Sequence, residues 1–396
     1  MKEIEKNLKL IEDKLIYPQI RLFSSAPDTE VEVDGRRVLM FCSNNYLGLA
    51  NHPKVKEATK KAIDKYGVGS GGSRILSGNY DIHQELENEL ADFKGGEDAI
   101  IFPSGFGTNL GVIPAIMNLF GNSILKVFKG KGVIFSDELN HASIVDGCRS
   151  SKSKLVIYKH KDMMDLEKKL KMFKRKRKLI VTDTIFSMDG DILPLDKIVD
   201  LAQKYDAMTM VDEAHATGVM GKRGAGAVEH FNLEGRIDIV MGTLSKALGS
   251  LGGYIIGSKE LVKYLRVAAR SYMFSTAIPP AYAASVIAAI KIIRSNPEIR
   301  QNLWNNVRYL KEGLHESGFS TLDSETQIIP ILVGDEKKAI EMSKLLFDKG
   351  VYAPCARWPA VPLGLSRIRV TVLANHTKEQ IDTFVEKCKE ARDEIN

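Results

Sequence analysis

The sequence contains few cysteines and no long apolar run, and both absences exclude classes of protein. Cys42, Cys148, Cys355 and Cys388 are scattered without a CxxC pair or metal-ligand spacing, so we expect neither disulfides nor a metal site. No apolar run approaches the roughly 20 residues that span a bilayer. Residues 1–20 lack the unbroken apolar stretch of a signal peptide and instead indicate an amphipathic helix. The sequence therefore predicts a cytoplasmic protein without stable membrane insertion.

The chain also lacks low-complexity segments, internal repeats and long linkers. At 396 residues, 44% of them hydrophobic, it exceeds the usual single-domain size, so we expect two closely connected domains. The net charge of +6 is mild, but residues 168–178 contain eight Lys or Arg residues. Because no aromatic interleaving or binding motif accompanies it, this run indicates a solvated helix end rather than a nucleic-acid site. Attraction of an anionic substrate such as coenzyme A stays open as an alternative.

Strand-like and helical segments alternate between about residues 84 and 260. The strand-like segments are short, rich in β-branched residues and nearly all apolar: DAIIF, GVIFS, KLVIY, KLIVTDTIF, AMTMVDEA, IDIVMGT and GGYIIGS. Such runs are typical of strands buried on both faces of a parallel sheet. The alternation predicts an α/β domain with a doubly wound, mostly parallel sheet.

The pattern changes after about residue 280, where long helical segments are followed by the strand-like segments QIIPILV and SRIRVTV. We expect a large domain at 46–284 and a small α+β domain at 285–396, with the boundary inside a helix. Residues 1–45 are expected to form a helix and strand segment that packs with the small domain.

A lysine follows one of the buried strands and has unusual neighbours. Lys246 lies in IDIVMGTLSKALGSLGG, between two apolar strands and beside several glycines. Burial lowers the pKa of an ammonium, which suits an amine that forms a Schiff base. Upstream, Asp212 ends the strand of VDEAHATG, where open α/β sheets bind ligands. A carboxylate there can pair with a protonated pyridine nitrogen, as pyridoxal phosphate (PLP) requires.

Two further features support a PLP site. A strand leads into Ser104, Gly105 and Phe106 and then into a helix, and free N–H groups at a helix N-terminus bind phosphate. His141 follows the strand GVIFS, where its ring can stack on a cofactor. The DEAH run could belong to a helicase, but that function needs a GxxxxGKS or GxxxxGKT loop, which the chain lacks.

The motifs that carry a family resemblance lie along nearly the whole chain: SNNYLGLANHP, GSGGSRILSGN, SDELNHASIVDG, FSMDGDILPL, VDEAHATGVMG, GTLSKALG, MFSTAIPPA and SRIRVTVLANHT. With these motifs the chain resembles the α-oxoamine synthases. The resemblance implies a PLP-dependent transferase of fold type I that condenses a small amino acid with an acyl-CoA, or an acyl carrier protein thioester, and releases CO2. It also implies a homodimer with shared active sites.

The resemblance implies roles for matching residues. Lys246 would bind PLP as a Schiff base and serve as the base, with Asp212 at the pyridine nitrogen and His141 on the ring. His215 and Ser187 would bind the phenolic oxygen, and Asn44 and Arg369 would bind the amino-acid carboxylate. The phosphate would be bound by Gly105, Phe106, Thr243, Ser245 and Thr276, with Thr276 reaching it from the partner subunit.

The substrates are less well determined by the sequence. Ser73 stands where 5-aminolevulinate synthases typically have threonine, which leaves room for alanine or serine. The runs FSMDGD and MGTLSKALG are most similar to 8-amino-7-oxononanoate synthases, which suggests L-alanine and a pimeloyl-type thioester. Glycine C-acetyltransferase and serine palmitoyltransferase activities stay open. An aminotransferase, or a non-catalytic subunit of the same fold, is disfavoured by the family motifs and by Lys246.

An insertion at 117–132 looks longer than the matching connection in common family members. A surface elaboration is the simpler interpretation. The alternative is an acyl-chain entrance lined by Leu119, Phe120, Ile124, Leu125 and Phe128.

Overall fold

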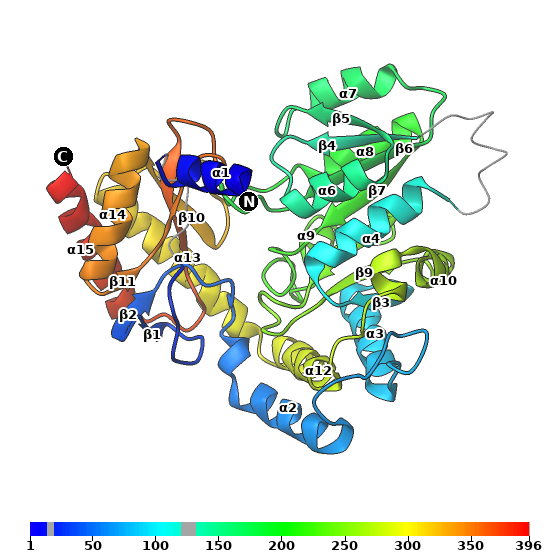
Figure 1. Ribbon diagram of the computed structural model, residues 1–396, viewed down its shortest axis with the longest axis horizontal. Helices are drawn as coiled ribbons and strands as arrows, with labels where there is room; N and C mark the ends of the chain where they lie inside the picture. The colour runs from blue at the N-terminus through cyan, green and yellow to red at the C-terminus, as the bar shows by residue number, and fades with distance from the viewer. Residues whose placement is uncertain (14–19, 120–131, 396) are drawn as a thin grey trace.

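The computed structural model describes residues 1–13, 20–119 and 132–395. Within this part, the largest sheet contains seven strands in the order β3-β9-β8-β7-β6-β4-β5 (Figure 1). The bounds are β3 Asp98–Phe102, β4 Val133–Asp137, β5 Lys154–Tyr158, β6 Lys178–Asp183, β7 Ala207–Asp212, β8 Ile239–Thr243 and β9 Gly253–Gly257. Strand β9 is antiparallel to both β3 and β8, and the other neighbours are parallel. The predicted mostly parallel α/β sheet is confirmed.

Alternate side chains of each strand point to opposite faces of this sheet, which is why the strands are apolar throughout. In β3, Ile100 and Phe102 belong to one core cluster with α4, α6 and α10, whereas Ala99 and Ile101 belong to a second cluster with α3, α7 and α8. Helices therefore cover both faces, as a doubly wound sheet requires. The bounds of the helices up to α11 are α1 Lys2–Asp13, η1 Leu49–Asn51, α2 Pro53–Tyr66, α3 Asp81–Lys94, α4 Gly105–Met117, α6 Ala142–Ser150, α7 Met163–Lys171, α8 Leu195–Tyr205, α9 Ala227–His230, α10 Lys259–Ala268 and α11 Arg270–Met273.

Two small three-stranded sheets form the second part of the molecule. One has the order β10-β13-β12 and is antiparallel, and the other joins β1 and β2 to β11. The bounds are β1 Glu30–Val33, β2 Arg36–Met40, β10 Ile328–Gly334, β11 Val351–Tyr352, β12 Cys355–Ala356, β13 Ser366–Thr371, α12 Pro280–Ser295, α13 Pro297–Glu316, α14 Glu336–Asp348 and α15 Lys378–Ile395. The two strand-like segments expected beyond residue 280 correspond to β10 and β13.

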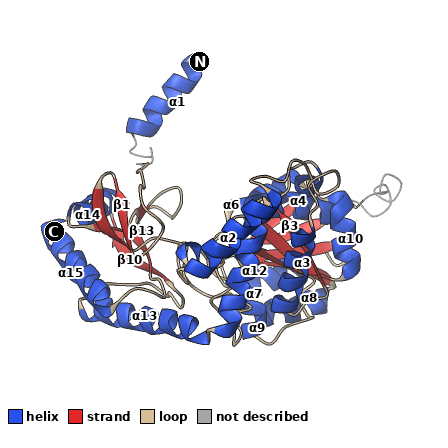
Figure 2. Cartoon of the chain, turned by 90° about the horizontal axis from the view of Figure 1, so that it is seen from below, coloured by secondary structure: helices blue, strands red, loops and turns tan. Residues whose placement is uncertain are grey.

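Residues 1–45 contain the helix α1 and the strands β1 and β2. Strand β1 pairs with β2, which pairs with β11 of the same small sheet, whereas α1 is exposed at its residues 2–12 and projects from the body of the molecule (Figure 2). The expected boundary at 284/285 falls within α12. The division of the chain into three segments stays a prediction.

The structure places the basic run of residues 168–178 at the end of a helix. The run 168–178 covers the end of α7 and the start of β6, so it lies at the opposite end of the sheet from the strand ends that carry Lys246 and Asp212. Two of its charges form ion pairs, Lys169 with Asp165 and Lys171 with Glu167. This placement supports a solvated helix end.

Of the proposed acyl entrance only Leu119 lies within the described residues, and Phe120, Ile124, Leu125 and Phe128 lie outside them.

Candidate active site

A cavity of about 220 Å³ lies at the carboxyl ends of β4, β6, β7 and β8. This is where an open α/β sheet binds its ligand. The cavity is lined by Ser104, Gly105, Phe106, His141, Ser143, Asp183, Ser187, Asp212, Ala214, His215, Met241, Thr243, Ser245, Lys246 and Leu251. Most of the residues predicted for the cofactor therefore meet in one place.

Lys246 is held by a chain of polar contacts. Its Nζ lies 2.7 Å from His215 Nε2, and His215 Nδ1 lies 2.6 Å from the buried hydroxyl of Tyr46. Tyr46 donates its proton to Asn44 Oδ1 at 3.1 Å. The Tyr46 oxygen must then accept from Nδ1–H, which leaves Nε2 as the acceptor that faces Lys246. Burial, followed by the charge of Lys246, lowers the pKa of His215 well below its usual value, so the ring is neutral.

The pKa of Lys246 is lower than that of an ordinary lysine. Burial lowers its pKa to about 8, against the opposing effects of Asp212 and Asp183, whose charges raise it. A neutral amine is the reactive form in Schiff-base formation. The site thus provides a lysine that is partly neutral at neutral pH.

We expect the rate of covalent PLP attachment to the apoenzyme to follow this pKa. Below about pH 8 the neutral fraction of Lys246 falls about tenfold per pH unit, and the attachment rate should fall with it. Stopped-flow absorbance after mixing apoenzyme with PLP measures this rate. A midpoint near 10.5, the ordinary lysine value, would contradict the argument.

Asp212 is buried and fixed in orientation. Its Oδ2 accepts from Asn109 Nδ2 at 2.9 Å, and its Oδ1 accepts from the Ala214 N–H at 2.9 Å. A charged, fixed carboxylate is suited to hold a proton on a pyridine nitrogen.

The start of α4 provides a cradle for a phosphate. Ser104 caps the helix by accepting from Gly107 N at 3.0 Å, which leaves the N–H groups of Gly105 and Phe106 at the helix start. The hydroxyls of Thr243 and Ser245 lie 2.8 Å apart beside them. A Cβ on Gly105 would lie 3.2 Å from Thr243 Oγ1 and would narrow this space. The donors and the absence of that Cβ fit the phosphate of PLP.

His141 follows β4 and caps the N-terminus of α6. Its Nδ1 accepts from Ser143 N at 3.2 Å, so the neutral ring presents Nε2 as the donor. The His141 N–H donates to Asp183 Oδ2 at 2.7 Å, which fixes the backbone beside the cavity. The ring is exposed to the cavity side, next to Phe106. This position suits stacking on a cofactor ring.

Asn44 and Arg369 lie beside the cavity without lining it. Arg369 Nε donates to the Ser187 carbonyl at 2.6 Å, and Asn44 accepts from Tyr46.

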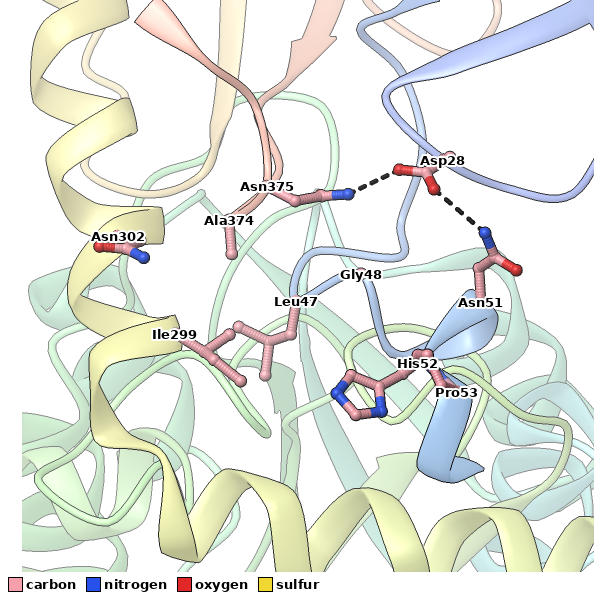
Figure 3. Close-up of a pocket in the computed structure, with 10 residues that line it drawn as sticks. All are labelled: Asp28, Leu47, Gly48, Asn51, His52, Pro53, Ile299, Asn302, Ala374 and Asn375. Atoms are coloured by element: carbon pink, nitrogen blue, oxygen red, sulfur yellow. Dashed lines mark hydrogen bonds between the residues drawn. The ribbon is translucent and has the colours of Figure 1, made fainter. Parts of the chain in front are cut away.

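A second pocket, of about 350 Å³, lies next to Leu47 and Gly48 (Figure 3). Within it, Asp28 accepts from Asn375 Nδ2 at 2.6 Å and from Asn51 Nδ2 at 3.0 Å, which ties the 44–51 segment to the small sheets.

Ser73 and Thr276 are the predicted site residues that lie away from the cavity of their own chain. They form an isolated antiparallel bridge with each other, and Thr276 is exposed. Large apolar residues around them are also exposed: Val68 at 79%, Leu76 at 83% and Phe274 at 68%. Large apolar residues with such high exposure are typical of an interaction surface.

The site residues missed from the sequence include Asp183, Asn109 and Tyr46. Asp183 is buried beside Asp212 and lines the cavity. Burial and the charge of Asp212 raise its pKa well above the usual value. Asp183 could have been found, because it ends β6 as Asp212 ends β7. Asn109 and Tyr46 carry no such signal.

Glu213, the second residue of the DEAH run, has a structural contact. It is fully buried and forms an ion pair with Lys94, which also donates to the Ala225 carbonyl. A buried carboxylate requires such a partner. The run therefore supplies two polar site residues, Asp212 and His215, and one structural residue, Glu213.

We expect Tyr46→Phe to lower kcat about tenfold, within the range of lost positioned hydrogen bonds. The variant keeps the ring but removes the oxygen that orients His215 toward Lys246. Tyr158→Phe is the matched control, because Tyr158 is equally buried on the edge strand β5. Equal activities of the two variants would contradict the role given to Tyr46.

Comparisons with known proteins agree with this geometry. The aminotransferase class I and II family matches residues 36–387. The chain is 47% identical to an 8-amino-7-oxononanoate synthase of Thermoanaerobacter pseudethanolicus over 99% of this chain and 97% of the relative. It is 48% identical to the enzyme of that name from Thermosipho melanesiensis, over 96% of this chain and 95% of the relative.

Solved structures show the same fold. A serine palmitoyltransferase from S. paucimobilis with a bound PLP–myriocin aldimine superposes with a TM-score of 0.90 at 34% identity, covering 100% of this chain and 97% of that chain. The 8-amino-7-oxononanoate synthase of Francisella tularensis superposes with a TM-score of 0.76 at 28% identity, covering 90% and 98%.

Proposed function

Because the chain belongs to the aminotransferase class I and II family and, within it, to the α-oxoamine synthases, we propose that it condenses L-alanine with a pimeloyl-type thioester. The products are 8-amino-7-oxononanoate, CO2 and the thiol. The chain is a PLP-dependent acyltransferase of fold type I. The observation that carries the substrate proposal is the 44–48% identity, over nearly the whole chain, to relatives of that name.

The arrangement of the site suits this chemistry. When bound, PLP supplies an electron sink for negative charge at the amino-acid Cα. Lys246 would hold the cofactor covalently, and its free Nζ would be placed to take the Cα proton. His215 accepts from that Nζ. Asp212 would hold a proton on the pyridine nitrogen. The charge and planar fork of Arg369 suit the amino-acid carboxylate.

Serine palmitoyltransferase is the second candidate, because several solved structures of that enzyme superpose with TM-scores of 0.90 to 0.91. Superposition of the whole backbone reports the fold, whereas the acyl chain is recognised by a few side chains. The higher identity to the oxononanoate synthases therefore carries more weight for the substrate. The donor can be a coenzyme A or an acyl carrier protein thioester.

The enzyme is further proposed to be a cytoplasmic homodimer. Thr276, exposed in a single chain amid apolar residues, would reach the phosphate of the partner's cofactor. The four cysteines are free, which fits a reducing compartment. No helix within the described residues could span a membrane, and they hold no cluster of metal-ligating side chains. Light scattering should give the mass of two chains.

A matrix of substrates tests the function. Glycine, L-alanine and L-serine are each combined with acetyl-, succinyl-, pimeloyl- and palmitoyl-CoA, and thiol release is measured. We expect the highest kcat/KM for L-alanine with pimeloyl-CoA. A preference for L-serine with palmitoyl-CoA would support the second candidate instead.

A further inference from the structure

The loop of residues 186–191 connects the cavity to the small sheets. Ser187 lines the cavity, and its carbonyl accepts from Arg369 Nε at 2.6 Å. Arg367, on the same strand as Arg369, donates to the Met188 carbonyl at 3.2 Å and to Asp189 Oδ1 at 2.5 Å. The loop therefore contacts both arginines of β13.

The base of the loop is bound to the large domain through His160. Its Nε2 lies 2.9 Å from Asp191 Oδ2, and its Nδ1 lies 3.0 Å from Asp137 Oδ1. The ring packs edge-on against Phe186, with 4.4 Å between ring centroids. Lys161 adds an ion pair, with its Nζ 2.9 Å from Asp191 Oδ2. His160 thus joins the end of β4 to both ends of the loop.

The two carboxylates determine the charge of His160. Since each ring nitrogen faces a carboxylate oxygen, both must be donors, and the ring is an imidazolium. Burial opposes this charge, but the hydrogen bonds that the ring donates to Asp137 and Asp191 outweigh burial and raise the pKa of His160 to about 9. Two further charged residues lie beside this group: Glu138 accepts from the His160 backbone N–H, and Lys161 forms an ion pair with Asp191. The contact is therefore intact at neutral pH and is lost as the pH rises through about 9.

The loop packs against the small sheets without free space. Gly190 has φ +71°, and a Cβ there would lie 2.0 Å from the Ile328 carbonyl oxygen. The Gly190 carbonyl accepts from Thr326 Oγ1 at 2.8 Å and from Glu325 N at 3.0 Å. Close-packed contacts transmit a displacement from one residue to the next. A shift of Asp191 therefore also moves Ser187, whose carbonyl accepts from Arg369.

We propose that His160 is a positioning residue for the amino-acid site, which it serves by fixing the 186–191 loop that orients Ser187 and Arg369. This inference rests on the proposed function, in which Arg369 binds the amino-acid carboxylate. His160 itself does not line the cavity. Its removal should therefore weaken amino-acid binding while leaving the cofactor and the acyl donor largely unaffected.

The test uses His160→Gln, which keeps a donor but removes the charge, in the PLP-bound enzyme. L-alanine is titrated without a thioester, and the absorbance change of bound PLP gives its Kd; steady-state assays then give KM for L-alanine and for pimeloyl-CoA. We expect Kd and KM for L-alanine to rise about tenfold, a loss of ~1.4 kcal/mol. PLP content and KM for the thioester should stay within about twofold. The control is His315→Gln, which makes the same change at an exposed histidine of α13.

Asp191→Asn is the second variant, in case His160→Gln does not fold. It should also raise the Kd for L-alanine, because it removes a charge from the same contact. Unchanged Kd for L-alanine in a folded variant would overturn the inference, as would equal losses for both substrates. If the unmodified enzyme shows no absorbance response to glycine, L-alanine or L-serine, the proposed function fails instead.

Discussion

Replacing Lys246 by alanine is expected to reduce kcat at least about 10³-fold, because one side chain serves as both covalent anchor and base. Lys246 lies 2.7 Å from His215 and faces the cavity between the phosphate cradle and Asp212. Borohydride reduction followed by mass spectrometry should find the cofactor on the peptide that contains Lys246. The Lys246→Ala protein should carry no covalently fixed cofactor.

Two further measurements separate this role from misfolding. Lys259→Ala, at the exposed start of α10, should keep full activity. A small added amine should partly restore turnover of Lys246→Ala, since it can act as the base at the same position. A Lys246→Ala enzyme that keeps full activity would contradict the assignment of the site.

Asp212→Asn is expected to lower kcat about 10²- to 10³-fold, the range for losing one preorganised electrostatic contact. The amide keeps the shape and can still bond to Asn109, but it carries no charge to hold a proton on the pyridine nitrogen. PLP should remain bound, because the phosphate cradle and Lys246 are unchanged. Steady-state kinetics and the PLP content of the purified variant measure both effects.

The comparison variant is Asp200→Asn, on the exposed face of α8. It makes the same chemical change outside the site and should leave kcat within about twofold. Activity of Asp212→Asn equal to that of Asp200→Asn would show that Asp212 does not act on the cofactor. Loss of PLP from Asp212→Asn would instead show a role in binding.

The strands and the main site residues were predictable for physical reasons. A parallel sheet buried on both faces leaves an apolar signature in every strand, and its carboxyl edge gathers the residues that follow those strands. Lys246, Asp212 and His141 were found by this rule. Asp183 was missed because the strand was expected to run through KLIVTDTIF, whereas β6 ends at Asp183.

Other features depend on packing between distant segments. Asn109 reaches Asp212 because α4 lies across the sheet, and no sequence spacing reveals that contact. The contact of His160 joins Asp137, at the end of β4, to Asp191 in a distant loop. Tyr46 contacts His215 across 169 residues of chain. Such contacts are set by the tertiary structure rather than by local propensity.

The most direct test of the central claim follows both leaving groups in one reaction. The purified PLP-bound enzyme is supplied with pimeloyl-CoA and L-alanine carrying ¹³C in its carboxyl group. Decarboxylative condensation predicts thiol and labelled CO2 in equal amounts, with an amino ketone as product. Formation of pyruvate without thiol release would contradict the claim and indicate an aminotransferase.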